Sequence, residues 1–501
     1  MSLSEDYNLY FGDLHNHNAV GYAKGSLQRT FDIAQEHLDF FAFTPHSQWH
    51  DMPKMPQDKH MVWVNGFEAH KKNWSRSQQM TREANTPGEF VAFPGYEWHS
   101  SDCGDYCVIF PDDNSEFIVA SPVGEMAAKL KPYGAIMFPH HTAYAKGWRG
   151  VDWDHFPAEV CPVAECYSEH GATFYDRGLH PMILHSMGGR TTRGTVFAAL
   201  SRGYRFGLIA GTDDHFGYPG AYREGLAAVW ADDLTRKSIW DAILSRRTYA
   251  VTGDRISLQF TLNDRPMGAE MDYQNKREIS CAVEAVGEID KVEVLKNGRV
   301  VHREFVPTVL PEDEFEGGAA KLRIQWGWGP WASLDMAEVC QWEGDIAVAG
   351  GSVTKATPMF QSGPYVEDLR DRLTDVGENG LNFSSFTSRE DAFLQDATKG
   401  VVLDLDGKPD TQITFTISEP AAISETYTLA ELMASSQTIF TGAFTSESVL
   451  IHRLVTPASY ELDFTWTDED SDPSSDDFYM IRVTQSNGHI AWSSPIWVDA
   501  G

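Results

Sequence analysis

Tyr10-Phe11-Gly12-Asp13-Leu14-His15-Asn16-His17 is an apolar, strand-like run that ends in two histidines spaced two positions apart. Side chains two positions apart along a strand point to the same side, so both imidazoles can reach one metal ion. A His-x-His motif standing alone is weak evidence, because short metal-binding motifs give many false matches. The motif therefore predicts a metal site only if other candidate ligands accompany it.

Five later apolar runs also end in candidate ligands. They span residues 38–44, 90–96, 134–139, 160–167 and 205–212, and their turn-bounded apolar character is typical of strands buried on both faces. The side chains at or just beyond the ends of these runs are His46, Glu97, His99, His140, His141, Glu165, His170, Asp213, Asp214 and His215. One histidine at a strand end is usually structural, but six clusters at equivalent positions favour a metal site.

Helical patterns separate several of these runs. Apolar side chains recur with helical spacing over residues 27–38 and 196–204. Alternation of strand and helix predicts parallel strands, and in a closed parallel barrel the carboxyl ends of the strands share the face where active sites form. We therefore expect the six clusters, distant in sequence, to converge on one pocket.

The second half of the chain has a different pattern. Alternating runs meet at Asn297-Gly298 and again at Asn487-Gly488, and Asn-Gly between such runs is a strong hairpin signal. Residues 412–417 and 460–466 are further predicted strands, and residues 363–400 are expected to add a short helix and an acidic loop. With 501 residues the chain is too long for one ordinary domain. We predict a metal-binding α/β domain over residues 1–250 and a β-rich, sandwich-like domain over residues 251–501.

The amino-acid composition limits the classes of partner that the protein is expected to bind. Asp and Glu outnumber Lys and Arg by 72 to 40, and the net charge of −32 opposes binding to nucleic acids or anionic membranes. No apolar stretch approaches 18 residues, and the N-terminal sequence lacks the features of a signal peptide. These features predict a cytoplasmic protein that acts on a small molecule and binds neither nucleic acid nor membrane, with homo-oligomerisation left open. Divalent metal ions in the pocket would offset the negative charge of the protein at the place where an anionic substrate binds.

Five motifs carry a resemblance to a known family. They are Gly12-Asp13-Leu14-His15-Asn16-His17, the stretch from Leu38 to His46, Pro94-Gly95-Tyr96-Glu97, Pro139-His140-His141 and Gly211-Thr212-Asp213-Asp214-His215. In order and spacing the chain resembles the polymerase-and-histidinol-phosphatase (PHP) superfamily of metal-dependent phosphoesterases, and more narrowly its large bacterial members with a β-rich C-terminal half. The resemblance implies a distorted (β/α)7 barrel of the PHP type that holds two or three divalent metal ions, which are manganese, zinc or iron.

The resemblance also implies a set of ligands, motif by motif. The implied metal ligands are His15, His17, Glu97 and Asp213 for a first ion; Glu97, one of His140 and His141, and His170 for a second; and His46 and His215 for a third. Family members usually carry an acidic residue or histidine soon after the second histidine, where this chain has residues 21–25. We hypothesise that Lys24 takes that place as a fixed cation that grips a substrate oxygen.

The implied chemistry is hydrolysis of a small phosphate ester. Two metals about 3.5–4 Å apart share a hydroxide that attacks phosphorus, and they clamp the attacking and leaving oxygens. Glu97 and Asp213 belong to this catalytic centre. Arginine suits phosphate through its bidentate fork. Arg149, Arg177, Arg205 and Arg223 lie near predicted strands or ligand clusters, and Arg149, Arg177 and Arg223 are the predicted substrate-binding residues. The general acid is left open among His99, His185 and Asp214.

Two alternatives remain open from sequence. The same pocket could hydrolyse a non-phosphate bond, such as a lactone or an amide, because clustered His, Asp and Glu on a barrel support that chemistry too. A carboxylated lysine on a strand would favour this reading. Alternatively, the protein could bind metal or ligand without turnover. Two departures from the family pattern favour that reading: residues 21–25, and Pro45, which stands where the family usually has Asp between Thr and His. The presence of His15, His17, Glu97 and Asp213 together opposes it.

Overall fold

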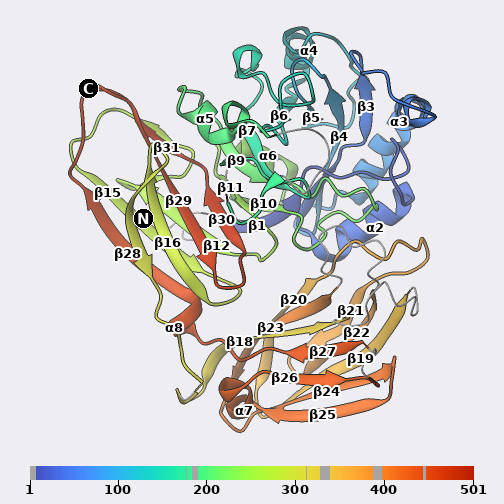
Figure 1. Cartoon of the computed structure of the whole chain (residues 1–501), viewed down its shortest axis with the longest axis vertical. Coiled ribbons are helices and arrows are strands. Elements are labelled where there is room, and N and C mark those ends of the chain that lie inside the picture. Colours follow the sequence, from blue (N-terminus) through green and yellow to red (C-terminus); the bar gives the residue numbers. More distant parts are fainter. Residues whose placement is uncertain are drawn as a thin grey trace. The chain divides into compact units, whose positions relative to one another are not determined.

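The computed structural model describes residues 7–175, 178–182, 190–311, 313–327, 339–387, 398–443 and 447–501. The chain divides into two compact units (Figure 1). Unit 1 contains residues 1–284, 291–305 and 462–501, and unit 2 contains residues 285–290 and 306–461. The expected boundary after residue 250 falls within strand β11 (Thr248–Val251), inside unit 1.

Unit 1 is built on a sheet of 14 strands. They are β1 (Asn8–Asp13), β2 (Phe40–Phe43), β3 (His46–Trp49), β4 (Val91–His99), β5 (Tyr106–Ile109), β6 (Ile136–Pro139), β10 (Leu226–Ala231), β11, β14 (Glu270–Met271), β16 (Ile289–Lys296), β17 (Arg299–Phe305), β29 (Asp477–Gln485), β30 (Ile490–Ser493) and β31 (Ile496–Val498). Its main path runs β14-β31-β29-β30-β11-β10-β1-β2-β4-β5-β6. The two ends of the chain are therefore joined in one sheet.

The strands that carry the candidate ligands run in a common direction. β1 pairs in parallel with β2, and β2 pairs in parallel with β4. β5 is antiparallel to both β4 and β6, so β6 runs in the same direction as β4. A second sheet contains β7 (Val163–Ser168), β8 (Gly171–Ala172) and β9 (Gly207–Ala210), with β7 and β9 parallel. The predicted mixed α/β character is confirmed, and closure into a seven-stranded barrel stays a prediction.

Helices cover the strands of unit 1 (Figure 1). They are α2 (Leu27–His37), α3 (Lys59–Ala84), α4 (Val123–Leu130), α5 (Val196–Leu200) and α6 (Arg236–Leu244), with short 3-10 turns η1 (Lys131–Tyr133), η2 (Trp153–His155) and η4 (Thr192–Gly194). Helix α2 begins after Ser26, whose hydroxyl accepts the backbone N–H of Arg29, and its buried side chains include Phe31 and Ala34. The helices predicted over 27–38 and 196–204 are thus present, and α5 ends at Leu200.

The C-terminal half is rich in strands, as predicted. Beside the large sheet, unit 1 has a four-stranded sheet of β12 (Ser257–Leu262), β13 (Arg265–Pro266), β15 (Arg277–Glu284) and β28 (Glu461–Asp468). The predicted hairpin at Asn297-Gly298 joins β16 to β17, with φ of 51° and 74° at the turn. The predicted hairpin at Asn487-Gly488 joins β29 to β30. Both signals are therefore confirmed.

Unit 2 contains two five-stranded sheets. One holds β18 (Gly318–Trp326), β20 (Ser352–Met359), β23 (Lys399–Gly407), β26 (Gln437–Phe440) and β27 (Ser448–Ile451); the other holds β19 (Cys340–Ala349), β21 (Arg372–Gly377), β22 (Gly380–Thr387), β24 (Gln412–Glu419) and β25 (Ile423–Thr428). Two short helices, α7 (Leu429–Ala434) and α8 (Pro457–Tyr460), connect strands. Trp326 of one sheet stacks on Phe383 of the other with ring centroids 4.5 Å apart, so the two sheets share a core.

The helix predicted in this half is absent from the described residues of its range and otherwise stays a prediction. Residues 363–400 were expected to contain a short helix, but the described part of that range contains the antiparallel hairpin of β21 and β22. The alternation in β22, in which odd-numbered residues such as Leu381 and Phe383 are buried, matches a strand with one buried face. Residues 388–397 lie outside the described residues.

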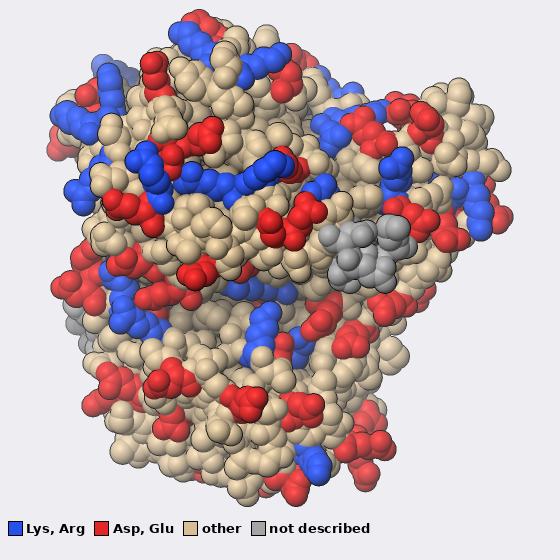
Figure 2. All heavy atoms as spheres, turned by 180° about the vertical axis from the view of Figure 1, so that it is seen from behind, with Lys and Arg blue, Asp and Glu red and all other residues tan. Residues whose placement is uncertain are grey.

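The surface reflects the acidic composition. Figure 2 shows one face, on which Lys and Arg occur in short groups among Asp and Glu. No helix of the described residues is both long enough and apolar enough to cross a membrane.

Candidate metal centre

The ends of β1 and β9 are tied together at the start of the centre. The Asp13 carboxylate at the end of β1 accepts hydrogen bonds from the backbone N–H of His15 and from both the backbone and hydroxyl of Thr212. His15 and His17 were predicted to lie within the strand, but β1 ends at Asp13. They flank Asn16, which forms an isolated parallel bridge with Asp214, so the backbone there is still locally extended.

Strand β4 brings further ligands to the same place. It continues through Glu97 to His99, and the pairing of β3 with β4 sets His46 opposite Glu97. Both residues at the end of β4 are buried, as is His46. Strand pairing thus fixes three candidate ligands before any side-chain interaction is considered.

A first group of candidate ligands gathers His15, His17 and Asp213. The His15 Nε2 and His17 Nε2 atoms lie 3.2 Å apart, and Asp213 Oδ1 lies 3.2 Å from the former and 3.0 Å from the latter. His17 Nε2 is also 3.4 Å from Glu97 Oε2. All four side chains are at most 3% exposed.

A second group surrounds Glu97. Its Oε1 lies 2.8 Å from His140 Nε2, and its Oε2 lies 2.5 Å from His46 Nδ1. His99 stands beside both, with its Nδ1 atom 3.2 Å from Glu97 Oε1 and its Nε2 atom 2.9 Å from His46 Nδ1. The Glu97 carboxylate therefore faces histidines on two sides.

The remaining predicted ligands extend the same cluster. His170 Nε2 lies 3.0 Å from Asp213 Oδ2. His215 Nε2 lies 3.1 Å from His46 Nε2, and the His215 side chain is 29% exposed, so this part of the cluster is the one nearest solvent. His141 is buried next to His140 and lies 3.5 Å from Asp105. The structure thus brings all nine predicted metal ligands into one cluster.

The spacing of these atoms fits metal ions. Ligand atoms bound at about 2.0–2.1 Å from one ion lie roughly 2.8–3.4 Å from their neighbours in octahedral or tetrahedral geometry. Groups such as His15–His17–Asp213, His17–His46–His215 and His46–Glu97–His99 each keep their ligand atoms within 4.8 Å of one another. Two neutral imidazole nitrogens 3.1–3.2 Å apart repel unless a proton or a cation lies between them. The described residues therefore form clusters that can bind metal ions.

In several histidines Nδ1, the ring nitrogen that faces away from the cluster, also has a partner. His15 Nδ1 lies 2.9 Å from Glu165 Oε2, and His170 Nδ1 lies 2.6 Å from the Tyr144 hydroxyl. His140 Nδ1 faces the Cys107 thiol at 3.9 Å. In each case Nε2 is left to point into the cluster, which is the usual arrangement of metal-binding histidines and their outer partners.

Burial and charge set the protonation of these groups. Burial lowers the pKa of His15 and His46 well below the ordinary value. Burial alone would raise the pKa of Glu97, but the neighbouring histidines, His99 first, hold it well below its ordinary value. Neutral imidazoles and ionised carboxylates are the forms that bind divalent cations.

Strained backbone marks the same region. Asp213, His141 and Arg149 are non-glycine residues with φ of 57°, 29° and 97°. Such conformations cost about 1–3 kcal/mol each and concentrate at functional sites. The surrounding structure therefore holds these three residues in a backbone conformation that they would not favour by themselves.

Arg149 is the buried cation of the centre. Its Nε donates to Asp105, and its Nη2 atom lies 3.5 Å from Glu97 Oε1. Its guanidinium lies over the rings of Trp49 and Trp63, 5.4 and 5.7 Å from their centroids. Burial opposes its charge, but Asp105 and Glu97 raise the pKa of Arg149 above the ordinary value.

The other predicted site residues lie outside this cluster or outside the described residues. The Lys24 side chain is exposed and sits over the Phe216 ring at 4.7 Å, so it does not fill the buried space suggested for it. Arg223 is half-buried and lies near the Tyr222 ring. Asp214 is buried, and its carboxylate accepts the backbone N–H groups of Phe216 and Tyr218. Arg177 and His185 fall outside the described residues.

Sequence reasoning missed three side chains of the centre. Asp105 precedes β5, and because β5 is antiparallel, its beginning rather than its end lies at the ligand-bearing side. Glu169 lies 3.3 Å from His215 Nδ1, and burial raises the pKa of this carboxyl to about 7. Cys107, buried on β5, places its thiol 3.9 Å from His140 Nδ1. A search of strand beginnings, as well as ends, would have found Asp105.

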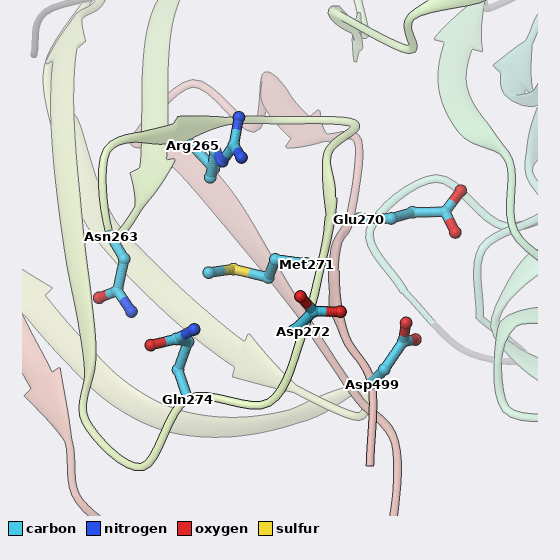
Figure 3. A pocket seen from close by; sticks show the side chains of 7 residues that line it. All are labelled: Asn263, Arg265, Glu270, Met271, Asp272, Gln274 and Asp499. Atoms are coloured by element: carbon cyan, nitrogen blue, oxygen red, sulfur yellow. The ribbon is translucent and has the colours of Figure 1, made fainter. Parts of the chain in front are cut away.

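A separate surface pocket of about 420 Å³ shares no residue with the cluster (Figure 3). Its lining residues are Asn263, Arg265, Glu270, Met271, Asp272, Gln274 and Asp499. Glu270 pairs with Arg205 and Arg246, and Asp499 pairs with Arg205, so two of its carboxylates are already neutralised.

Comparisons with known proteins leave the function open. A model of the DUF3604 family, described as a protein of unknown function, matches residues 25–130 and 220–282. An uncharacterised protein of Chlamydia pneumoniae is 31% identical over 199 residues, which is 37% of this chain and 32% of the relative. An uncharacterised protein of Chlamydia muridarum is 28% identical over 248 residues, which is 45% of this chain and 40% of the relative. The chain thus spans 32% to 40% of the length of these relatives.

A solved structure is also similar in part. It is a two-domain protein from Bacteroides vulgatus that contains a predicted PHP-like metal-dependent phosphoesterase. It is 11% identical, with a TM-score of 0.34, over 85% of this chain and 96% of that chain.

Proposed function

We propose that this protein is a metal-dependent hydrolase that cleaves small phosphate esters. The observation that carries the proposal is the buried cluster in which His15, His17, Glu97 and Asp213 point ligand atoms at one another. Structural histidines in a core are normally satisfied by hydrogen-bond donors and acceptors, not by other imidazole nitrogens. A cluster of this composition has a use only if cations occupy it.

The ligand set suits two or three divalent ions. His15, His17 and Asp213 would hold one ion, and Glu97 would bridge it to a second held by His140. His46 and His215 would contribute to a third position. Nitrogen and carboxylate ligands suit manganese, zinc and iron alike. Such ions lower the pKa of bound water and neutralise charge on phosphoryl oxygens.

Arg149 favours phosphate over an uncharged bond. A guanidinium fixed beside the ligands, with Asp105 and two tryptophan rings holding it, needs no reorganisation when charge builds up on a phosphoryl group. A lactone or an amide develops charge on one oxygen during hydrolysis, whereas a phosphoryl group presents several charged oxygens, which suit the guanidinium fork better. Catalytic or substrate-binding roles for His99, Arg177 and Arg223 remain part of the proposal, with His99 the best placed of them.

The test is phosphate release from a panel of small phosphomonoesters and diesters. The protein is stripped of metal, reloaded separately with Mn²⁺, Zn²⁺ or Fe²⁺, and compared with His17→Ala. His155→Ala serves as the control, because His155 is exposed and pairs with Asp152 away from the cluster. We expect turnover in the wild type and in the control, and none in His17→Ala.

Two outcomes would contradict the proposal. Bound metal without phosphate release, accompanied by turnover of a lactone or an amide, would favour the alternative hydrolase. Bound metal with no turnover on either panel would favour a binding protein. Metal analysis of the same samples gives the number of ions, which we expect to be two or three.

A further inference from the structure

We infer that Glu165 is a positioning residue of the metal centre, acting through His15. Its carboxylate holds the N–H of His15 at Nδ1, so that the Nε2 lone pair is presented to the ion. The inference rests on the metal-binding part of the proposed function and is independent of the substrate.

The geometry of the pair is specific. Glu165 Oε2 lies 2.9 Å from His15 Nδ1, and the two side chains are 1% and 0% exposed. On the other side of the ring, His15 Nε2 faces His17 Nε2 and Asp213 Oδ1, each at 3.2 Å. One imidazole thus has a carboxylate behind it and the cluster in front of it.

The fold keeps room for this pair. Glu165 lies on β7, in register with Ile209 of the parallel strand β9. Just beyond β9, a Cβ at Gly211 would lie 2.7 Å from Glu165 Oε2 and 2.7 Å from the His15 Cβ. Any other residue at position 211 would push the carboxylate and the imidazole apart, so the glycine and the pair are mutually dependent.

The chemistry of the two groups gives the contact its direction. A neutral imidazole carries one N–H, and an ionised carboxylate can only accept a hydrogen bond. With Glu165 ionised, the N–H belongs at Nδ1, which leaves Nε2 as the lone pair. Outer carboxylates of this kind also make the ligand more basic, and their loss commonly weakens metal binding about 10- to 100-fold. His140 has only the weaker Cys107 thiol in the equivalent place.

The experiment measures metal affinity without any substrate. Full-length protein is titrated with Mn²⁺ and with Zn²⁺ against a chromophoric chelator, as wild type and as Glu165→Gln and Glu165→Leu. Glu293→Gln is the matched control, because Glu293 is an equally buried carboxylate of unit 1 that pairs with Arg303 and Arg482. We expect affinity to fall about 10-fold in Glu165→Gln and up to about 100-fold in Glu165→Leu, and to stay unchanged in the control.

A double-mutant cycle separates positioning from general structural damage. If Glu165 acts through His15, Glu165→Gln in a His15→Ala background causes no further loss of affinity. Cobalt-loaded protein adds a spectroscopic readout: the exchangeable N–H proton of the bound His15 is observed in the wild type and is broadened in Glu165→Leu.

Each result decides the matter. Wild-type affinity in both Glu165 variants, a loss equal to that of Glu293→Gln, or an additive loss in the double variant would each overturn the inference. A wild type that binds no metal would overturn it together with the proposed function. A wild type that shows the Glu165 effect but hydrolyses no phosphate ester would support the inference and refute only the proposed hydrolase.

Discussion

At the scale of single residues, Arg149 combines a buried charge with a left-handed backbone of φ 97°. The ion pair with Asp105, the nearby Glu97 carboxylate and the Trp49 and Trp63 rings hold it. A guanidinium so constrained is placed to meet negative charge that develops on a substrate.

We predict that Arg149→Met lowers turnover of the preferred phosphate ester by about 100- to 1000-fold, the usual effect of removing one fixed donor from a transition state. The turnover of Arg149→Lys should lie between those of the wild type and of Arg149→Met, because lysine keeps the charge but loses the planar fork. Bound metal, measured by elemental analysis, should be undiminished in both. Turnover of Arg149→Met close to the wild-type value would show that the cation serves only to balance charge.

His70 makes the stability of the protein sensitive to acid. It lies on α3, buried among Trp74, Tyr96 and Phe117, and neither ring nitrogen has a hydrogen-bond partner among the described residues. Burial lowers its pKa to about 3. The unfolded chain, with an ordinary value near 6.5, therefore binds more protons between these two values, and stability falls as pH drops below about 6.5.

We predict that His70→Leu removes this acid sensitivity. Between pH 7 and pH 5 the wild type should lose about 2 kcal/mol more unfolding free energy than the variant. Urea unfolding at the two pH values measures this, and any packing change caused by leucine cancels in the comparison between them. Equal losses in both proteins would show that His70 is protonated in the folded state.

The ligands of the centre could be predicted from sequence wherever the direction of their strands could be predicted. The histidines and carboxylates at the ends of parallel runs are gathered in the structure, because the sequence rule assumes parallel strands. Asp105 was missed because β5 reverses direction, which no local pattern around Tyr106–Ile109 reveals. Glu165 was noticed as polar in an apolar run, but its role depends on His15, which is 150 residues away.

At the scale of elements, the two Asn-Gly hairpins offer a matched comparison. Gly298 and Gly488 have φ of 74° and 88°, a backbone conformation that favours glycine. A Cβ at Gly298 would lie 1.6 Å from the Phe197 ring, whereas a Cβ at Gly488 would meet nothing within 4 Å. An alanine would be strained in either turn, but only an alanine at position 298 would also clash with a neighbouring side chain.

We predict that Gly488→Ala lowers the unfolding free energy by about 1 kcal/mol, through backbone strain alone. Gly298→Ala should lower it by about 2–4 kcal/mol, because overpacking adds to the strain. Chemical denaturation of the two variants measures the difference. Equal losses would mean that Phe197 moves aside freely.

These hairpins were predictable because their signal is local. The hairpin of β21 and β22 was missed although Asn379-Gly380 lies at its turn, because the mostly exposed side chains of β21 show no alternation. Pairing with β19 across the sheet, not local sequence, decides that β22 is a strand.

At the scale of the whole chain, the ends of the sequence determine how unit 1 is built. Strand β30 pairs with β11, with Tyr249 opposite Ser493 and Val251 opposite Ala491. The Ser494 hydroxyl accepts the backbone N–H of Leu208 and donates to the carbonyl of Thr248. No sequence pattern in residues 1–250 indicates that a strand there pairs with one more than 200 positions away. A domain boundary placed at residue 251, where the sequence pattern changes, therefore separates strands that pair with each other.

The last prediction follows from that pairing. A fragment of residues 1–250 would leave β11 as a bare edge and expose buried rings such as Tyr167 and Phe174, which lie within 6.3 and 6.4 Å of Trp492. We expect this fragment to aggregate, to unfold without cooperativity in urea and to bind metal at least tenfold more weakly than the full chain. Replacing residues 306–461 with a flexible linker is the matched control, because it keeps every candidate ligand and every strand of the large sheet. The control should retain metal binding; a fragment 1–250 that folds cooperatively and binds metal as tightly as the full chain would show that the C-terminal strands are dispensable to the centre.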